Sequence, residues 1–173
     1  MLEDGSLYAT LHQMFGSESP IRVYDVHRMD ARQIEELISK VHSTVGVGGV
    51  FFDMIDNIDI YIKNKLSRTD QVLEAKYQWS RALGVTYDYP TVAMSQQSES
   101  NDYQQWPSKG MLKDSKVGKQ GASDNIIFIT QPEDDTIQDV RYISAPKNKT
   151  ALRGAKRLRA EVKFDRDTGI FYD

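Results

Sequence analysis

The first residue whose position suits it to chemistry is Asp53, a carboxylate directly after an apolar run. The run Val50–Phe52 follows the glycine-rich segment Gly46–Gly49. Short runs rich in Val and Phe and bounded by glycine are typical of strands buried on both faces. Open α/β sheets bind ligands in the crevice at the carboxyl ends of such strands. Asp53 is therefore a candidate ligand-binding residue, and the alternative is that it only caps the following turn.

A second apolar run also ends on polar residues. Pro90 precedes the strand pattern Thr91–Gln96, whose last residues are a serine and a glutamine. Strands joined through a helix run parallel, so their carboxyl ends meet at the same edge of a sheet. We therefore expect Asp53 and Gln96 at one edge of a parallel sheet.

Helices with one apolar stripe must position these strands. Apolar residues at helical spacing predict an opening helix over Leu7–Phe15 that ends at Gly16. Asp30 is predicted to cap the next helix, which the glycines from Gly46 onward end. A third helix is predicted over Thr69–Gly84, with Trp79 in the core rather than available for base stacking.

Short strand patterns complete the fold. Ile21–Tyr24 is predicted to be a strand that forms a parallel strand–helix–strand unit with Val50–Phe52. The segment Asn57–Arg68 is predicted to be a loop. Two hairpins are predicted in the last third of the chain, where strand patterns flank short polar turns. Their strands are Asn125–Thr130 with Val140–Ser144, and Ala160–Phe164 with Ile170–Tyr172.

Length and composition indicate one ordinary globular domain. The chain has 173 residues, of which 39% are hydrophobic and 27% charged. No run approaches the length of a membrane span, and the acidic start Met1–Asp4 does not resemble a signal peptide. The absence of cysteine excludes disulfides and thiolate metal sites, and it is compatible with a reducing cytoplasm.

The basic residues are concentrated in the second half of the chain. The formal net charge is -3, yet most basic clusters fall between Lys109 and Arg166. Such asymmetry indicates a face for a polyanion, either nucleic acid or phosphate. The alternative is a solvated charged surface. The densest cluster comprises Lys147, Lys149, Arg153, Lys156, Arg157 and Arg159.

Four blocks of the sequence, in this order, resemble one family. They resemble the RecA-like motor domain of DnaB-like hexameric replicative helicases, the group that includes bacteriophage primase-helicases. The resemblance covers the chain from about Ile21 to its end. The blocks are Val50–Asp56, Val92–Gln97, Leu112–Asp124 and Lys147–Phe171.

This resemblance implies an α/β fold, a RecA-like and mostly parallel sheet flanked by helices and followed by C-terminal β-hairpins. It also implies Mg²⁺ and ATP, or another NTP, as cofactors. Asp53 matches the Walker B aspartate, which holds the magnesium through water. Gln96 matches a polar sensor of the γ-phosphate, and the alternative is that it only hydrogen-bonds a neighbouring loop.

The resemblance assigns the long polar segment from Ser98 to Gln120 to the central channel that holds single-stranded DNA. Lysines there would contact phosphates in a sequence-independent and salt-sensitive way. Gln120 matches a glutamine that couples this loop to the nucleotide site. The lysines concerned are Lys109, Lys113, Lys116 and Lys119.

Lys147 and Lys149 match a Lys-x-Arg pair that reaches into the nucleotide site of the next subunit of a homo-hexamer. The second position is lysine here, which lacks the planar fork of a guanidinium. Arg153 is the alternative candidate for the role of a finger in trans. A solvated strand end is the other interpretation of the pair.

One motif of the family is absent. The sequence contains no G-x-x-x-x-G-K-[ST], and the family's catalytic glutamate has no counterpart. We therefore expect residues 1–173 to be a single partial domain, the C-terminal two-thirds of a motor. The whole would be an ATP-dependent DNA helicase of replication in a bacterial or phage-infected cytoplasm, and the isolated chain would be inactive as an ATPase.

Three alternatives follow from that absence. The chain is a fragment of a longer helicase, one half of a split gene whose partner chain carries the phosphate loop, or a non-catalytic RecA-like interaction module. A nuclease built on Asp53, Asp56 and Asp59 would need further acidic ligands, which the sequence does not offer.

Overall fold

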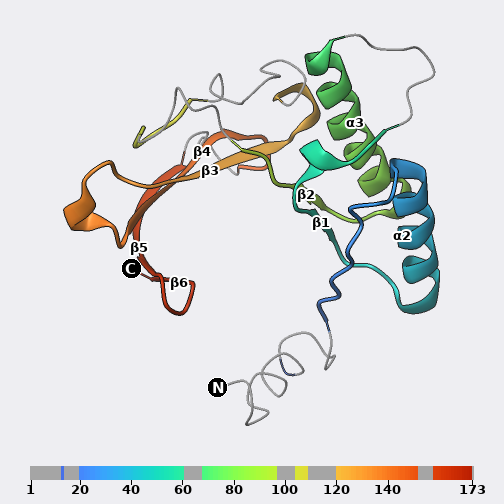
Figure 1. Ribbon diagram of the computed structural model, residues 1–173, viewed down its shortest axis with the longest axis horizontal. Helices are drawn as coiled ribbons and strands as arrows, with labels where there is room; N and C mark the ends of the chain where they lie inside the picture. The colour runs from blue at the N-terminus through green and yellow to red at the C-terminus, as the bar shows by residue number, and fades with distance from the viewer. Residues whose placement is uncertain are drawn as a thin grey trace.

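Two β-sheets and two helices form the part of the chain that the computed structural model describes, namely residues 13, 20–60, 68–96, 104–108, 120–151 and 158–172. β1 (Val50–Phe52) and β2 (Thr91–Ala93) pair in parallel. The second sheet is antiparallel, with its strands in chain order (Figure 1). Its strands are β3 (Asn125–Thr130), β4 (Val140–Asn148), β5 (Leu158–Asp165) and β6 (Ile170–Tyr172).

The helix α2 (Ala31–Val45) begins and ends at the residues that the sequence indicates. The Asp30 carboxylate accepts hydrogen bonds from the backbone N–H groups of Arg32 and Gln33, at 2.9 and 3.0 Å. The Gln33 side chain in turn accepts from the Asp30 N–H at 2.9 Å, which completes a capping box. Gly46 ends the helix with φ at 77°, a conformation that glycine adopts without strain.

The helix α3 (Thr69–Tyr87) begins where predicted but continues three residues beyond the predicted end at Gly84. Asp88, in the left-handed conformation with φ at 55°, ends it instead. Gly84 lies inside the helix because the chain returns against it. A Cβ atom there would stand 2.8 Å from the carbonyl oxygen of Tyr89.

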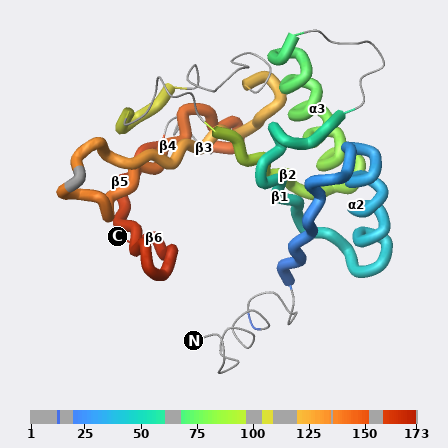
Figure 2. Tube along the Cα trace, viewed as in Figure 1, coloured from blue at the N-terminus to red at the C-terminus, as the bar shows by residue number. Residues whose placement is uncertain are grey.

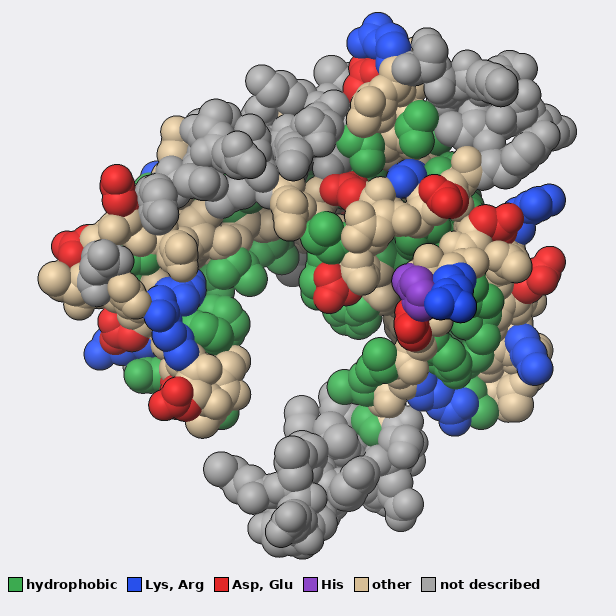
Figure 3. Space-filling view, viewed as in Figure 1, with side chains coloured by type: hydrophobic (Ala, Val, Ile, Leu, Met, Phe, Trp, Pro, Cys, Tyr) green, Lys and Arg blue, Asp and Glu red, His purple; other side chains and the backbone are tan. Residues whose placement is uncertain are grey.

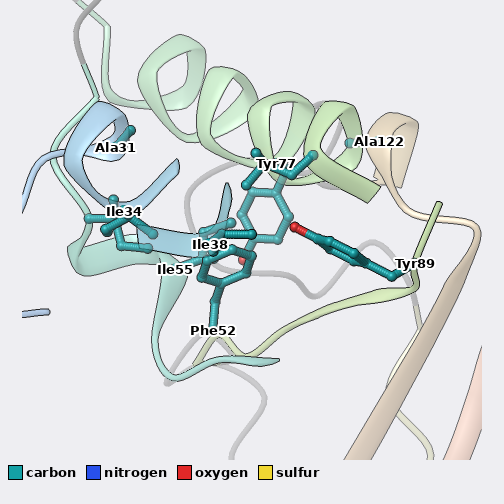
Figure 4. Close-up of a cluster of buried hydrophobic side chains, with 10 residues drawn as sticks. Ala31, Ile34, Ile38, Phe52, Ile55, Tyr77, Tyr89 and Ala122 are labelled. Atoms are coloured by element: carbon teal, nitrogen blue, oxygen red, sulfur yellow. The ribbon is translucent and has the colours of Figure 1, made fainter. Parts of the chain in front are cut away.

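The core lies between the helices and one face of the parallel sheet. α2 and α3 lie on the same side of β1 and β2 (Figures 1 and 2). Phe52 enters the cluster from β1 and meets Trp79 of α3, with their ring centroids 5.3 Å apart. Ile55, fully buried, follows in the short 3₁₀ helix η1 (Ile55–Asn57) (Figure 4). The prediction that Trp79 belongs to the core agrees with this packing.

The opposite face of the parallel sheet is bare among the described residues. Phe51 is 70% exposed, and its neighbour across the ladder, Val92, is 42% exposed. Met94, two residues further along the same face, is 47% exposed. The prediction that the strand before Asp53 is buried on both faces is therefore wrong, since helices cover one face only.

The two C-terminal hairpins form as predicted. β3 alternates between exposed and buried residues, as a half-buried strand should. β4 pairs with β3 and runs to Asn148, four residues beyond the predicted end. β5 and β6 pair across a turn in which Gly169 has φ at 72°. A further 3₁₀ helix, η4 (Asp135–Ile137), lies between β3 and β4.

The predicted strand Ile21–Tyr24 does not form. Ile21 and Val23 are 72% and 91% exposed, and the segment pairs with no described strand. The parallel crossover is instead β1–α3–β2. The predicted opening helix falls outside the described residues, except for Gln13, which is helical. No described helix has both the length and the apolar composition that a bilayer span requires.

Candidate functional site

The parallel ladder brings the two predicted site residues to one edge. Phe52 and Ala93 are opposite one another in the register, and the Met94 N–H donates to the Phe52 carbonyl at 3.0 Å. Asp53 directly follows β1, and Gln96 follows β2 three residues after its last residue. The expected shared edge is present, and the roles of both residues remain predictions.

Asp53 is exposed and available to a ligand. Its carboxylate makes no hydrogen bond or ion pair with the described residues. The short helix η1 that follows begins after Met54 and has no side-chain cap. The alternative that Asp53 only caps the next turn therefore has no support in the structure. The peptide bond between Asp53 and Met54 is cis.

Asp56, three residues later, is engaged on both carboxylate oxygens. The hydroxyl of Ser95 donates to one oxygen at 2.6 Å, and the hydroxyl of Tyr77 donates to the other at 3.2 Å. The ammonium of Lys76 donates to the Asp56 backbone carbonyl at 2.6 Å. Sequence reasoning considered Asp56 only as a possible metal ligand. The polar residue Ser95, next to Gln96, was the one sequence signal that Asp56 could accept a hydrogen bond from the end of the other strand.

Burial shifts the pKa values of both α3 residues at this junction. Lys76 is 8% exposed, and burial lowers its pKa, while the carboxylates of Asp59 and Asp56 act in the opposite direction. Tyr77 is also 8% exposed, and burial is the main reason that its pKa is raised. Tyr77 thus keeps its hydroxyl proton at neutral pH and serves as a hydrogen-bond donor.

A divalent cation fits this edge only if a nucleotide supplies part of its coordination. Among the described residues, no group of three or more acidic or histidine side chains could hold a metal by itself. Asp53 offers one carboxylate without a partner in the described part of the chain, while Asp56 is already bonded. Mg²⁺ commonly takes one or two carboxylates, several waters and the phosphates of its substrate. The residues present fit a hydrated magnesium that a nucleotide also binds, and they do not form the acidic cluster of a nuclease.

Gln96 is exposed, and its side-chain amide makes no hydrogen bond with the described residues. Its backbone carbonyl lies 3.4 Å from the Ser95 hydroxyl. The amide is therefore able to donate to an anion at this edge. The alternative, in which Gln96 only bonds a neighbouring loop, concerns residues 97–103, which lie outside the described part of the chain.

Lys147 and Gln120 meet at the far end of β4. The Lys147 ammonium donates to the Gln120 backbone carbonyl, and both residues are half-buried. The first lysine of the predicted Lys-x-Arg pair and the predicted coupling glutamine are thus direct neighbours. Sequence reasoning did not foresee this contact, because the two residues lie 27 positions apart.

Lys149 forms an ion pair within its own chain. Its ammonium lies 3.0 Å from the Asp124 carboxylate, which also accepts from Arg81 of α3 at 3.1 Å. Arg81 donates as well to the carbonyl of Ala122 at 2.8 Å. The hydrogen bond from Lys149, and then that from Arg81, lowers the pKa of Asp124. Lys149 is therefore held at the base of β3 and β4.

The predicted DNA-binding lysines fall outside the described residues, and so does Arg153. The described segment 104–108 from the same part of the chain docks on the antiparallel sheet. The Trp106 ring lies 5.3 Å from that of Tyr142, and the Arg159 guanidinium lies 5.3 Å from the Trp106 ring centre. Thr130 donates to the Gln105 carbonyl at 3.2 Å. The lysines outside the described residues are Lys109, Lys113, Lys116 and Lys119.

Comparison with known proteins gives the fold. No protein-family model matches the sequence, and no curated protein sequence matches it significantly. One solved ATPase domain is similar in structure, with a TM-score of 0.67 and 14% identity over 83% of this chain and 51% of that chain. A DnaB-like replicative helicase, described with its interactions with primase, has a TM-score of 0.73 and 14% identity, over 97% of this chain and 41% of that chain.

The chain thus spans about half or less of the length of these two structures. Its small parallel sheet and its antiparallel hairpin sheet match part of a RecA-like domain, which confirms the expected fold class. The described chain has the fold of a DnaB-like helicase domain.

Proposed function

We propose that this chain is part of an ATP-dependent DNA helicase that translocates on single-stranded DNA during replication. The observation that carries the proposal is the edge where β1 and β2 end, in a fold similar to that of a DnaB-like replicative helicase. There Asp53 and Gln96 follow neighbouring parallel strands, and neither the carboxylate nor the amide is bonded to a described residue. Ligands of open α/β sheets bind at such an edge.

Each residue has a simple task at that edge. Asp53 holds a water of the magnesium that accompanies the nucleotide, since one exposed carboxylate suits a hydrated cation. The Gln96 amide would donate to a γ-phosphate oxygen of the bound nucleotide. Bound magnesium and ATP supply the charge neutralisation and the free energy of hydrolysis.

The far end of β4 is the proposed contact with the neighbouring subunit in a hexamer. Lys149 would place its positive charge near the phosphates of the next nucleotide site. Since it pairs with Asp124 here, it must leave that carboxylate to act in trans. Lys147 and Gln120 would transmit the movement of the DNA-binding loop to β4, because their contact joins the two.

A segment that carries the phosphate loop must complete the site. We propose a strand, a phosphate loop and a helix, supplied by a partner chain or by more of the same protein. Parallel sheets are almost always covered on both faces, whereas Phe51, Val92 and Met94 stay exposed here. The space-filling view shows a hollow between the β5–β6 hairpin and the half that holds α2, with hydrophobic side chains on both sides (Figure 3).

That bare face also favours the second candidate, a non-catalytic RecA-like module that docks on a replication partner. The two candidates differ in what the chain binds. A motor segment binds single-stranded DNA through its lysine loop, whereas a docking module does not need to.

Single-stranded DNA binding by the 173-residue chain tests the proposal. Fluorescence anisotropy with a labelled oligonucleotide should show an affinity that falls steeply with salt. Each phosphate contact on a single strand contributes roughly 0.7 to the slope of log K against log salt. Changing the four lysines of the loop to glutamine should therefore reduce the magnitude of that slope by about 3. The changed residues are Lys109, Lys113, Lys116 and Lys119.

The matched control changes four exposed basic residues elsewhere to glutamine and should leave the slope close to that of the wild type. Absent binding, salt-insensitive binding, or equal slopes for both quadruple variants would contradict the DNA-binding role and favour the docking module. The control residues are Arg22, Lys40, Lys163 and Arg166.

A further inference from the structure

Asp56 joins the ends of both parallel strands to α3. Its carboxylate accepts from Ser95 at 2.6 Å and from Tyr77 at 3.2 Å, and its backbone carbonyl accepts from Lys76 at 2.6 Å. Asp56 lies three residues after Asp53, and Ser95 directly precedes Gln96. One side chain therefore connects the two segments that contain the proposed nucleotide-binding residues.

The junction is well shielded from water. Lys76 and Tyr77 are each 8% exposed, and Asp56 and Ser95 are half-buried. Hydrogen bonds to a charged group are stronger than neutral ones, and shielding makes their loss costly. The strand ladder ends with the bond from Met94 to Phe52. Beyond it, the Ser95–Asp56 bond continues the attachment of the β2 end to the β1 end.

The geometry argues against a direct metal role for Asp56. Both carboxylate oxygens already accept from hydroxyl groups, whereas Asp53 has no partner among the described residues. A residue bonded in this way orients its neighbours. Asp59, in contrast, makes no side-chain hydrogen bond within the described part of the chain, although its charge also acts on Lys76. It is therefore a matched electrostatic control.

We propose that Asp56 is a positioning residue that holds Gln96 in a fixed place relative to Asp53. The inference rests on the proposed function, from which the roles of Asp53 and Gln96 are taken. Because Lys76 and Tyr77 belong to α3, Asp56 also fixes the position of Gln96 relative to that helix. The same helix contacts Asp124 through Arg81.

The first measurement requires no metal. In the ¹⁵N-labelled 173-residue chain, the backbone amide of Gln96 should be rigid, with an order parameter of about 0.85. In Asp56→Ala and in Ser95→Ala this order parameter should fall below about 0.6. Asp59→Asn should remain like the wild type. If Asp56→Ala does not fold, Ser95→Ala alone decides, because it removes the hydroxyl next to Gln96 and leaves the bonds from Tyr77 and Lys76 to Asp56 in place. An unchanged order parameter in Ser95→Ala would overturn the proposal.

A second measurement separates this inference from the proposed function. Manganese bound to ATP, added in place of magnesium and ATP, should broaden the backbone amide signal of Asp53 and the side-chain amide signal of Gln96 in the wild-type chain. In Ser95→Ala the broadening at Asp53 should persist while that at the Gln96 side chain weakens, because a loosened side chain spends more time away from the metal. Unchanged broadening at Gln96 in Ser95→Ala would count against Asp56 as a positioning residue. Absence of broadening at Asp53 in the wild type would count against the metal role of Asp53 and leave the order-parameter result to decide on Asp56.

Discussion

Replacement of Gly84 by alanine should destabilise the protein, although alanine is the better helix former. Inside α3, alanine favours the helix by about 1 kcal/mol relative to glycine. The added Cβ would stand 2.8 Å from the carbonyl oxygen of Tyr89 and 3.4 Å from a methyl group of Thr91. The first contact is with backbone, so no side-chain rotation relieves it.

Relief therefore requires a shift of the connection that leads from α3 into β2. Forcing extra volume into a packed position costs about 1–3 kcal/mol, which exceeds the gain in helix propensity or equals it. The expected net loss, taken from the middle of that range, is about 1 kcal/mol. The same shift would weaken the bond from the Tyr89 N–H to the Gly84 carbonyl, now 3.1 Å long, and would move the strand that leads to Gln96.

Urea denaturation followed by circular dichroism measures this loss. Gly121→Ala is the matched control, because a Cβ at Gly121 meets no atom of the described residues within 4 Å and its φ is not positive. The control should be as stable as the wild type, or more stable by up to about 1 kcal/mol. If Gly84→Ala matches or exceeds the wild type while the control behaves as expected, the argument from the close approach of Tyr89 is refuted. Amide shifts at Gln96 should change in Gly84→Ala only.

Two further predictions concern alkaline pH and catalysis. The Tyr89 hydroxyl is buried without a hydrogen-bond partner among the described residues, and burial raises its pKa to about 12. Because the folded-state pKa is the higher one, the stability it contributes is fully present below about pH 10 and is lost as the pH rises toward 12. Tyr89→Phe should be at least as stable at neutral pH and lose less stability in that window, whereas the exposed Tyr172→Phe should change neither result in urea titrations. For catalysis, the chain alone should release no phosphate from ATP above background, since it has no phosphate loop; a rate that Asp53→Asn abolishes and Asp59→Asn preserves would contradict this.

Local signals in the sequence determined much of the fold. The capping box of Asp30 and Gln33 and the glycine at 46 define α2, because each acts within one helical turn. Alternation of apolar and polar residues defines β3 and its hairpin with β4. The order of strand ends placed Asp53 and Gln96 at one edge, since parallel pairing through a helix leaves no other arrangement.

Tertiary contacts decided the rest. Phe51 belongs to an apolar run, and the run alone does not distinguish a strand covered on both faces from one covered on a single face. Ile21–Tyr24 has a strand-like composition, but a strand also needs a partner, and pairing depends on distant residues. Gly84 has the composition of a helix end, but it lies inside α3 because the backbone of Tyr89 packs closely against it.

The site divides in the same way. Asp53 and Gln96, whose side chains have no partner among the described residues, were predictable because their strands end locally in polar residues. The hydrogen-bonded groups of the site were not predictable. Asp56 bonds to Ser95, which lies 39 positions away in the sequence, and Lys149 bonds to Asp124, which lies 25 positions away. A hydrogen bond between distant residues depends on how elements pack, which the spacing of residues along the chain does not encode. The sequence alone therefore determined which polar side chains follow the two strands, and the tertiary structure decided which groups hold those segments in place.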